Sequence, residues 1–81
     1  MNIQLIQGQF SINDAVDIIT QMVQVKIKFQ EDKIQHSSNE EDIKMREARI
    51  KQLQTTLLET KKYIENNGEK VNIQSEIHLS D

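Results

Sequence analysis

Apolar residues recur at every seventh position through a strongly charged stretch in the second half of the chain, at Ile43, Ile50, Leu57 and Ile64. Positions seven apart return to the same side of an α-helix after two turns. The spacing therefore predicts an amphipathic helix over about residues 40–66, with Leu53 adding an intermediate apolar position. The other intermediate positions hold Arg46 and Thr60, so the apolar seam is partial. A helix with such a seam needs a second helix to cover it.

Signals for the start of this helix lie in residues 36–39, which form the predicted turn before it. Ser38 with Glu41 fits a capping box. Ser37 with Glu40 fits the same motif one residue earlier, and either pair would satisfy backbone N–H groups of the first turn. Acid–base pairs four residues apart add about 0.2–0.5 kcal/mol each to a helix. Three such pairs follow the turn: Glu40–Lys44, Asp42–Arg46 and Glu47–Lys51.

A more apolar helix is predicted before the turn, over about residues 12–36. Ser11 suits its N-cap, and Asp14 places a negative charge near the positive N-terminal end. One apolar stripe follows at helical spacing and consists of Ile12, Val16, Ile19 and Val23, continued roughly by Ile27 and Ile34. A second stripe consists of Ala15, Met22 and Phe29 and is widened by Ile18 and Val25. A helix with two apolar stripes needs to be covered on more than one side.

Residues 22–30 also fit a strand, because apolar and polar side chains alternate there and several are β-branched. We predict helix instead, since no glycine, proline or turn cluster separates this stretch from the capped helical pattern before it. A helix that continues to about His36 also matches the next helix in length. The choice matters, because a strand here would remove the helical hairpin.

Short strands are predicted over residues 1–9 and 71–79, where apolar and polar residues alternate. The apolar set of the second strand is Val71, Ile73, Ile77 and Leu79. In the first strand the alternating apolar residues are Met1, Ile3 and Leu5. Ile6 breaks that alternation, and a β-bulge near Gly8 would return Phe10 to the apolar face.

These elements predict a mainly α, α+β fold with the order β-α-α-β in a single domain, residues 1–81. The helices form a long antiparallel hairpin joined by the short turn. The first strand ends, and the last begins, at the open end of the hairpin, so the two strands can pair antiparallel. A two-stranded ribbon is marginal alone and has two free edges, and the chain has no cysteine to staple it. We therefore expect a homo-oligomer, with a dimer favoured.

The composition of the chain indicates which classes of partner and which cellular compartment to expect. The net charge of −3 at pH 7 does not favour nucleic acid or an anionic membrane as a partner. No apolar run approaches the roughly 20 residues of a membrane-spanning helix. No basic residue precedes Lys26, whereas a secretory signal begins with positive charge. We expect a cytoplasmic protein that has no membrane partner.

Two groups of polar residues resemble known kinds of site only in residue type. His36 lies near the acids of residues 40–42, but the spacing crosses a turn and matches no metal-ligand signature. His78, Ser80 and Asp81 are the residue types of a hydrolytic triad, but nothing near them builds an oxyanion hole or a pocket. The two glycines are isolated, so they form no phosphate-binding loop. The sequence therefore predicts no catalytic, cofactor-binding or metal-binding residue, and no enzyme.

The expected function is non-catalytic: a homo-oligomeric interaction or scaffold protein that binds its own copies or a protein partner. The alternative is a small nucleic-acid-associated regulator, because a strand before two helices is also the element order of the ribbon-helix-helix DNA-binding proteins, whose strands pair across a dimer. The resemblance is limited to that order. Strands of that family usually carry basic residues towards the DNA, whereas Asn2, Gln4 and Gln7 are neutral. The helices here are also longer, and a second strand is added.

Overall fold

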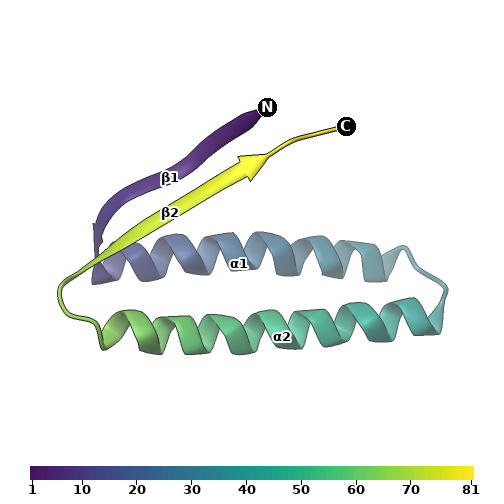
Figure 1. Cartoon of the computed structure of the whole chain (residues 1–81). Helices are drawn as coiled ribbons and strands as arrows, with labels where there is room; N and C mark the ends of the chain where they lie inside the picture. The colour runs from purple at the N-terminus through teal and green to yellow at the C-terminus, as the bar shows by residue number, and fades with distance from the viewer.

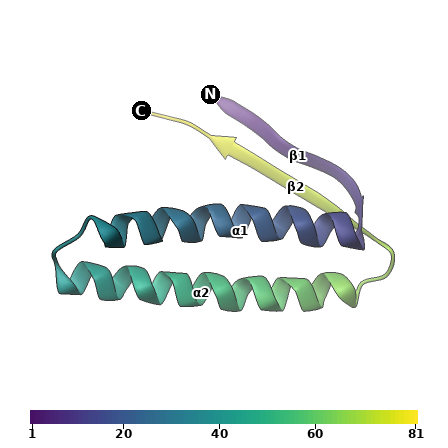
Figure 2. The same ribbon diagram turned by 180° about the vertical axis from the view of Figure 1, so that it is seen from behind.

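The computed structural model describes all 81 residues of the chain. The elements follow the order β1 (Asn2–Ser11), α1 (Ile12–Gln35), α2 (Glu40–Glu65) and β2 (Lys70–His78). Figure 1 shows the helices side by side as an antiparallel hairpin, with the two strands running over α1 from the open end of the hairpin. The view from behind in Figure 2 shows the same arrangement. The strands form one antiparallel two-stranded ribbon, which confirms the predicted β-α-α-β fold.

α1 begins where the sequence predicts. The Ser11 hydroxyl oxygen accepts a hydrogen bond from the backbone N–H of Asp14 at 3.2 Å, which satisfies one of the free donors at the helix start. The helix then runs without a break through residues 22–30, so the prediction of helix there is confirmed. The apolar residues of this stretch divide between two sides of the helix, since Ile27 is half-buried and Val25 is exposed.

α2 is capped by a residue that the sequence pattern did not single out. Asn39 Oδ1 accepts hydrogen bonds from the N–H groups of Glu41 at 2.9 Å and Asp42 at 3.1 Å. The predicted caps at Ser37 and Ser38 are therefore wrong. The loop instead turns the Ser37 hydroxyl onto the N–H of Asn39, 3.3 Å away. A single asparagine oxygen thus satisfies two of the helix donors that a serine was expected to satisfy.

The connection from α2 to β2 depends on a glycine. The N–H of Asn66 closes the helix by donating to the carbonyl oxygen of Lys62 at 3.1 Å. Gly68 then adopts a φ of +98°, which residues with a side chain rarely adopt. The chain reverses at this point, and β2 begins at Lys70, one residue earlier than predicted.

The strand register slips by one residue at Leu5. The bulge predicted near Gly8 is therefore in the wrong place. The extra residue at Leu5 turns both Ile3 and Ile6 towards the face of the ribbon that also carries Phe10. All three are half-buried, whereas Leu5 is exposed. A bulge at Gly8 would have left Ile6 on the solvent side, so the slip at Leu5 buries more apolar surface.

The fold is a flat plate. Its principal extents are 46 × 32 × 13 Å, so its thickness is less than half of either other dimension. Ribbon, α1 and α2 follow one another across the plate (Figure 1). Only Ala15 and Ile64 are fully buried, at 0% and 3% exposure. Domains normally bury apolar faces between at least two layers of secondary structure. This chain alone buries very little apolar surface in that way.

Candidate functional site

The chain exposes more surface than a compact protein of its mass. Its accessible surface is 6528 Å², whereas a compact monomer of 9.5 kDa exposes roughly 5,000 Å². Its radius of gyration is 15.3 Å, against about 12 Å for a compact domain of this length. The excess surface is on the order of 1,500 Å². An area of that size exceeds the roughly 800 Å² that each partner contributes to a standard stable interface.

The second apolar stripe of α1 is covered only in its first half. Ala15, near the base of the ribbon, is completely buried, and Ile18 and Met22 are half-buried. Val25 is 71% exposed, and Phe29 is also exposed. Burial falls along the helix because the ribbon diverges from α1 as it leaves its base (Figure 1). The sequence predicts that this stripe needs cover, but the ribbon of the same chain supplies only part of it.

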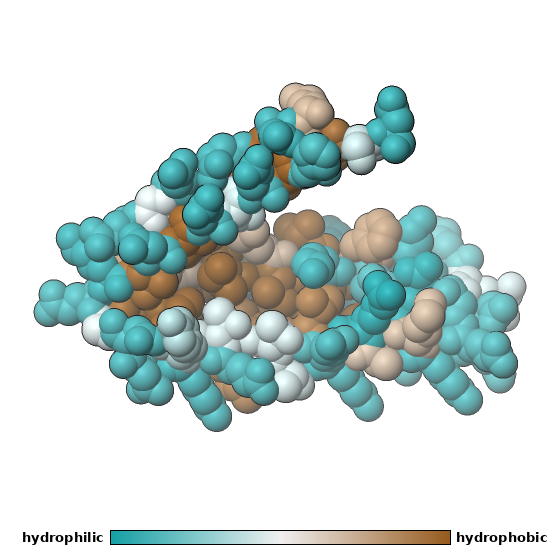
Figure 3. All heavy atoms as spheres, in the orientation of Figure 1, coloured by the Kyte–Doolittle hydropathy of each residue, from teal (hydrophilic) through white to brown (hydrophobic).

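An open groove lies in the angle between the outer part of the ribbon and the middle of α1. This ribbon groove is lined by Leu5, Ile19, Met22, Val23, Val25, Lys26 and Ile77. Its volume is about 480 Å³. Figure 3 shows an apolar surface along α1 that continues beneath the ribbon, whose outer surface is largely hydrophilic. A concave apolar surface with one charged residue suits contact with another apolar surface.

Leu5 lies at the register slip in β1 and lines the groove together with Ile77 of β2. The sequence pattern placed Leu5 on the apolar face with Ile3, but it did not indicate that Leu5 would line a groove. In the structure Leu5 and Ile77 form the strand wall of the groove. The signal that could have located the bulge is Ile6, since it breaks the alternation immediately after Leu5.

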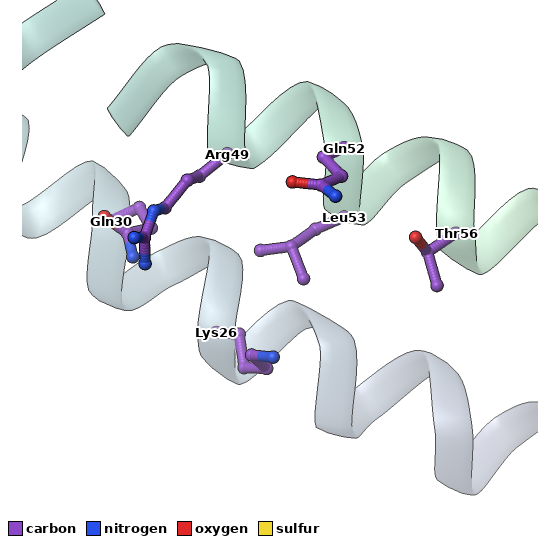
Figure 4. Close-up of a pocket in the computed structure, with 6 residues that line it drawn as sticks. All are labelled: Lys26, Gln30, Arg49, Gln52, Leu53 and Thr56. Atoms are coloured by element: carbon purple, nitrogen blue, oxygen red, sulfur yellow. The ribbon is translucent and has the colours of Figure 1, made fainter. Parts of the chain in front are cut away.

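A second groove, between the two helices, is mainly polar. It has a volume of about 400 Å³ and is lined by Lys26, Gln30, Arg49, Gln52, Leu53 and Thr56. Figure 4 shows Arg49 of α2 extending towards Gln30 of α1, while Leu53 points into the space between the helices. These residues include no carboxylate, histidine or thiol, so they supply neither an acid–base pair nor the usual ligands of a metal. We assign no chemistry to this groove.

The two histidines make local hydrogen bonds. His36 Nδ1 donates to the backbone carbonyl oxygen of Asp32 at 2.8 Å. His78 Nδ1 donates to Oδ1 of Asn2, its partner across the ribbon. No group of three or more His, Asp or Glu side chains is placed to hold a metal ion. Neither histidine hydrogen-bonds to the side chains grouped with it in the sequence, which are the acids of residues 40–42 for His36, and Ser80 and Asp81 for His78.

One ion pair forms within the first two turns of α2. Of the three predicted acid–base pairs on α2, Asp42–Arg46 forms an ion pair, with Arg46 Nε 3.1 Å from Asp42 Oδ2. The hydrogen bond from Arg46, and then one from Ser37, hold the pKa of Asp42 below its ordinary value of 3.8. This contact lies in the first two turns of α2, at the end of the hairpin away from the base of the ribbon (Figure 1).

No protein-family model, curated protein sequence or solved structure matches this chain. Neither of the two helices has a stretch long and apolar enough to cross a membrane. Among the concave surfaces of the molecule, the ribbon groove is the one with a mainly apolar lining.

Proposed function

We propose that the chain is a non-catalytic, homo-oligomeric interaction or scaffold protein of the cytoplasm, and that its smallest assembly is a dimer. The observation that supports this proposal is the open plate, in which only two of 81 residues are fully buried. The chain also has no disulfide to stabilise it. A core in a chain this small rarely supplies more than about 3–5 kcal/mol. A second copy packed on the exposed apolar surface adds the missing layer.

The size of the excess surface supports association between copies. Covering on the order of 1,500 Å² on each of two chains buries about 3,000 Å² in total, which is in the range of obligate homodimers. Weak and transient complexes bury less than about 1,200 Å². We therefore propose a permanent assembly, in which each chain folds against its partner.

Multi-angle light scattering on the intact chain tests this proposal. At high micromolar concentration we expect a mass of at least twice the 9.5 kDa of the single chain. The mass of one chain under the same conditions would contradict the proposal.

A small nucleic-acid-associated regulator of ribbon-helix type is the alternative function. Its support is the order of the elements alone, and β1 here pairs with β2 of the same chain. Binding to heparin and to nonspecific DNA at low salt separates the two functions. A regulator binds both and loses affinity steeply as the salt concentration rises, whereas the scaffold protein binds neither.

A further inference from the structure

We propose that the ribbon groove is the dimer interface and that a second copy of this chain occupies it across a two-fold axis. In this arrangement the ribbon tip of each chain, formed by Leu5, Ile77 and Leu79, covers the second half of α1 of the other chain. The inference rests on the proposed homo-oligomeric function and deepens it by naming the surface through which the copies associate.

Each chain presents two apolar surfaces that its own fold leaves uncovered. One is the ribbon tip, whose residues Leu5, Ile77 and Leu79 are all exposed. The other is the second half of α1, where Val25 and Phe29 are exposed. Leu5 and Ile77 form one wall of the ribbon groove, and Val25 belongs to the other. A two-fold axis at the groove places the ribbon tip of each chain on the α1 of the other. The ribbon tip and the second half of α1 are then covered in both chains.

The charges near the groove allow two identical surfaces to meet. Lys26 is the one charged residue in its lining, and its long aliphatic stem lets the ammonium group reach solvent at the rim. Beyond the groove, Lys33 Nζ lies 5.5 Å from the centre of the Phe29 ring, which is within the range of a cation–π contact. No carboxylate lines the groove, so packing against its walls removes no carboxylate there from water.

The area favours a second copy over a small ligand. A ligand that fills the groove volume of about 480 Å³ would leave Leu79 and Phe29 exposed, because neither residue lines it. A standard stable interface needs about 800 Å² from each partner, and the excess surface of this chain, on the order of 1,500 Å², exceeds that requirement. The apolar walls supply the central, charge-poor region that such interfaces contain.

A matched pair of charge substitutions tests the interface. Val25 and Leu58 are 71% and 55% exposed in the single chain, so a carboxylate at either position should leave its fold intact. Leu58 serves as the control because it lies one turn after Gln54. Gln54 lines a different groove, which shares no residue with the ribbon groove. We expect Val25→Glu to raise the dissociation constant of the dimer at least about a hundredfold, as loss of a central contact does. Leu58→Glu should leave the mass measured by light scattering unchanged.

Single-cysteine labelling gives a second readout that does not require dissociation, because the chain has no cysteine of its own. In the single chain Val25 is more exposed than Leu58, so Val25→Cys should react with a thiol reagent at least as fast as Leu58→Cys. The proposed interface reverses that order. We expect Val25→Cys to react at least about tenfold more slowly in the assembled protein, because the site must open before it reacts.

The outcomes separate the two proposals. If the intact chain has the mass of one chain, the proposed function itself is wrong, and slow labelling of Val25→Cys would then mean that the ribbon closes onto α1 of its own chain. If the intact chain is oligomeric but Val25→Cys reacts as fast as Leu58→Cys, the copies associate through another surface. In that case the inference is overturned while the proposed function stands.

Discussion

At the scale of single residues, Arg46 shows how a break in an apolar pattern can stabilise a fold. It occupies a seam position of α2, and its guanidinium donates to Gln30 Oε1 of α1 at 2.9 Å and to Asp42 Oδ2 at 3.1 Å. The residue that interrupts the heptad pattern therefore joins the two helices near the turn. Such a charge-assisted network also fixes which residues lie opposite each other along the hairpin.

The lowered pKa of Asp42 predicts an acid-dependent contribution to stability. Because the hydrogen bonds from Arg46 and Ser37 favour the ionised form in the folded chain, the contribution is complete above the ordinary pKa of 3.8. It is lost as the pH falls through the lower folded value. We expect the free energy of unfolding of Asp42→Asn to fall less than that of the wild type as the pH drops below 3.8. Parallel acid dependence of the two proteins in urea titrations would contradict this assignment.

Ala15 and Ala48 form a natural pair for testing the packing beneath the ribbon, since they are the two alanines of the chain. Ala15 is fully buried, so Ala15→Leu should lower the free energy of unfolding by about 1–3 kcal/mol through overpacking. Ala48 is exposed on α2, and Ala48→Leu should change it by less than about 0.5 kcal/mol. Equal effects of the two substitutions in urea melts would show that the ribbon does not pack on α1 at this point.

At the scale of elements, the seam of α2 can be tested with two adjacent leucines. Leu57 lies in the heptad seam and is half-buried, whereas Leu58 is 55% exposed. We expect Leu57→Ala to cost about 2 kcal/mol, at the lower end of the range for a buried leucine. Leu58→Ala should cost less than about 0.5 kcal/mol. A loss below about 0.5 kcal/mol for Leu57→Ala in urea melts would show that the seam faces solvent.

The strand β2 is expected to contribute to the assembly as well as to the ribbon. Removing residues 71–81 takes away the half-buried Val71 and Ile73 and the ribbon-tip residues Ile77 and Leu79. The surface of α1 beneath them then becomes exposed, so light scattering should show a lower oligomeric state or aggregation. A shortened chain with the size and stability of the intact oligomer would show that association runs through the helices alone.

The elements themselves follow closely from the sequence, and their ends depend on local hydrogen bonds. The periodic apolar stripes determine both helices, and Ser11 begins α1 as predicted. The cap at Asn39 was not predicted, because three polar residues in succession compete for the same helix donors and the loop geometry decides between them. The register slip at Leu5 was predicted at the wrong residue. A one-residue shift moves every later side chain of a strand to the opposite face, and the apolar pattern allowed several positions for that shift.

At the scale of the whole molecule, the order of the elements and their pairing could be predicted, but the open angle between ribbon and α1 could not. Hydrophobic periodicity records which side of an element is buried, and it does not record the direction in which a ribbon leaves a hairpin. The second stripe of α1 showed that cover was needed. Only the structure shows that Ala15, near the base of the ribbon, is fully buried while Val25 stays exposed. The apolar walls of the ribbon groove thus belong to predicted stripes, while the groove itself is a finding of the structure.

The dependence of the urea midpoint on protein concentration tests most directly whether this fold is completed by a second copy. When unfolding is coupled to dissociation of a dimer, a hundredfold increase in protein concentration raises the apparent free energy of unfolding by about 2.7 kcal/mol. For a small protein this moves the urea midpoint upwards by on the order of 1 M. We expect such a shift between low and high micromolar protein. The same midpoint at both concentrations would show that the single chain is stable alone, and would contradict an assembly in which each chain folds against its partner.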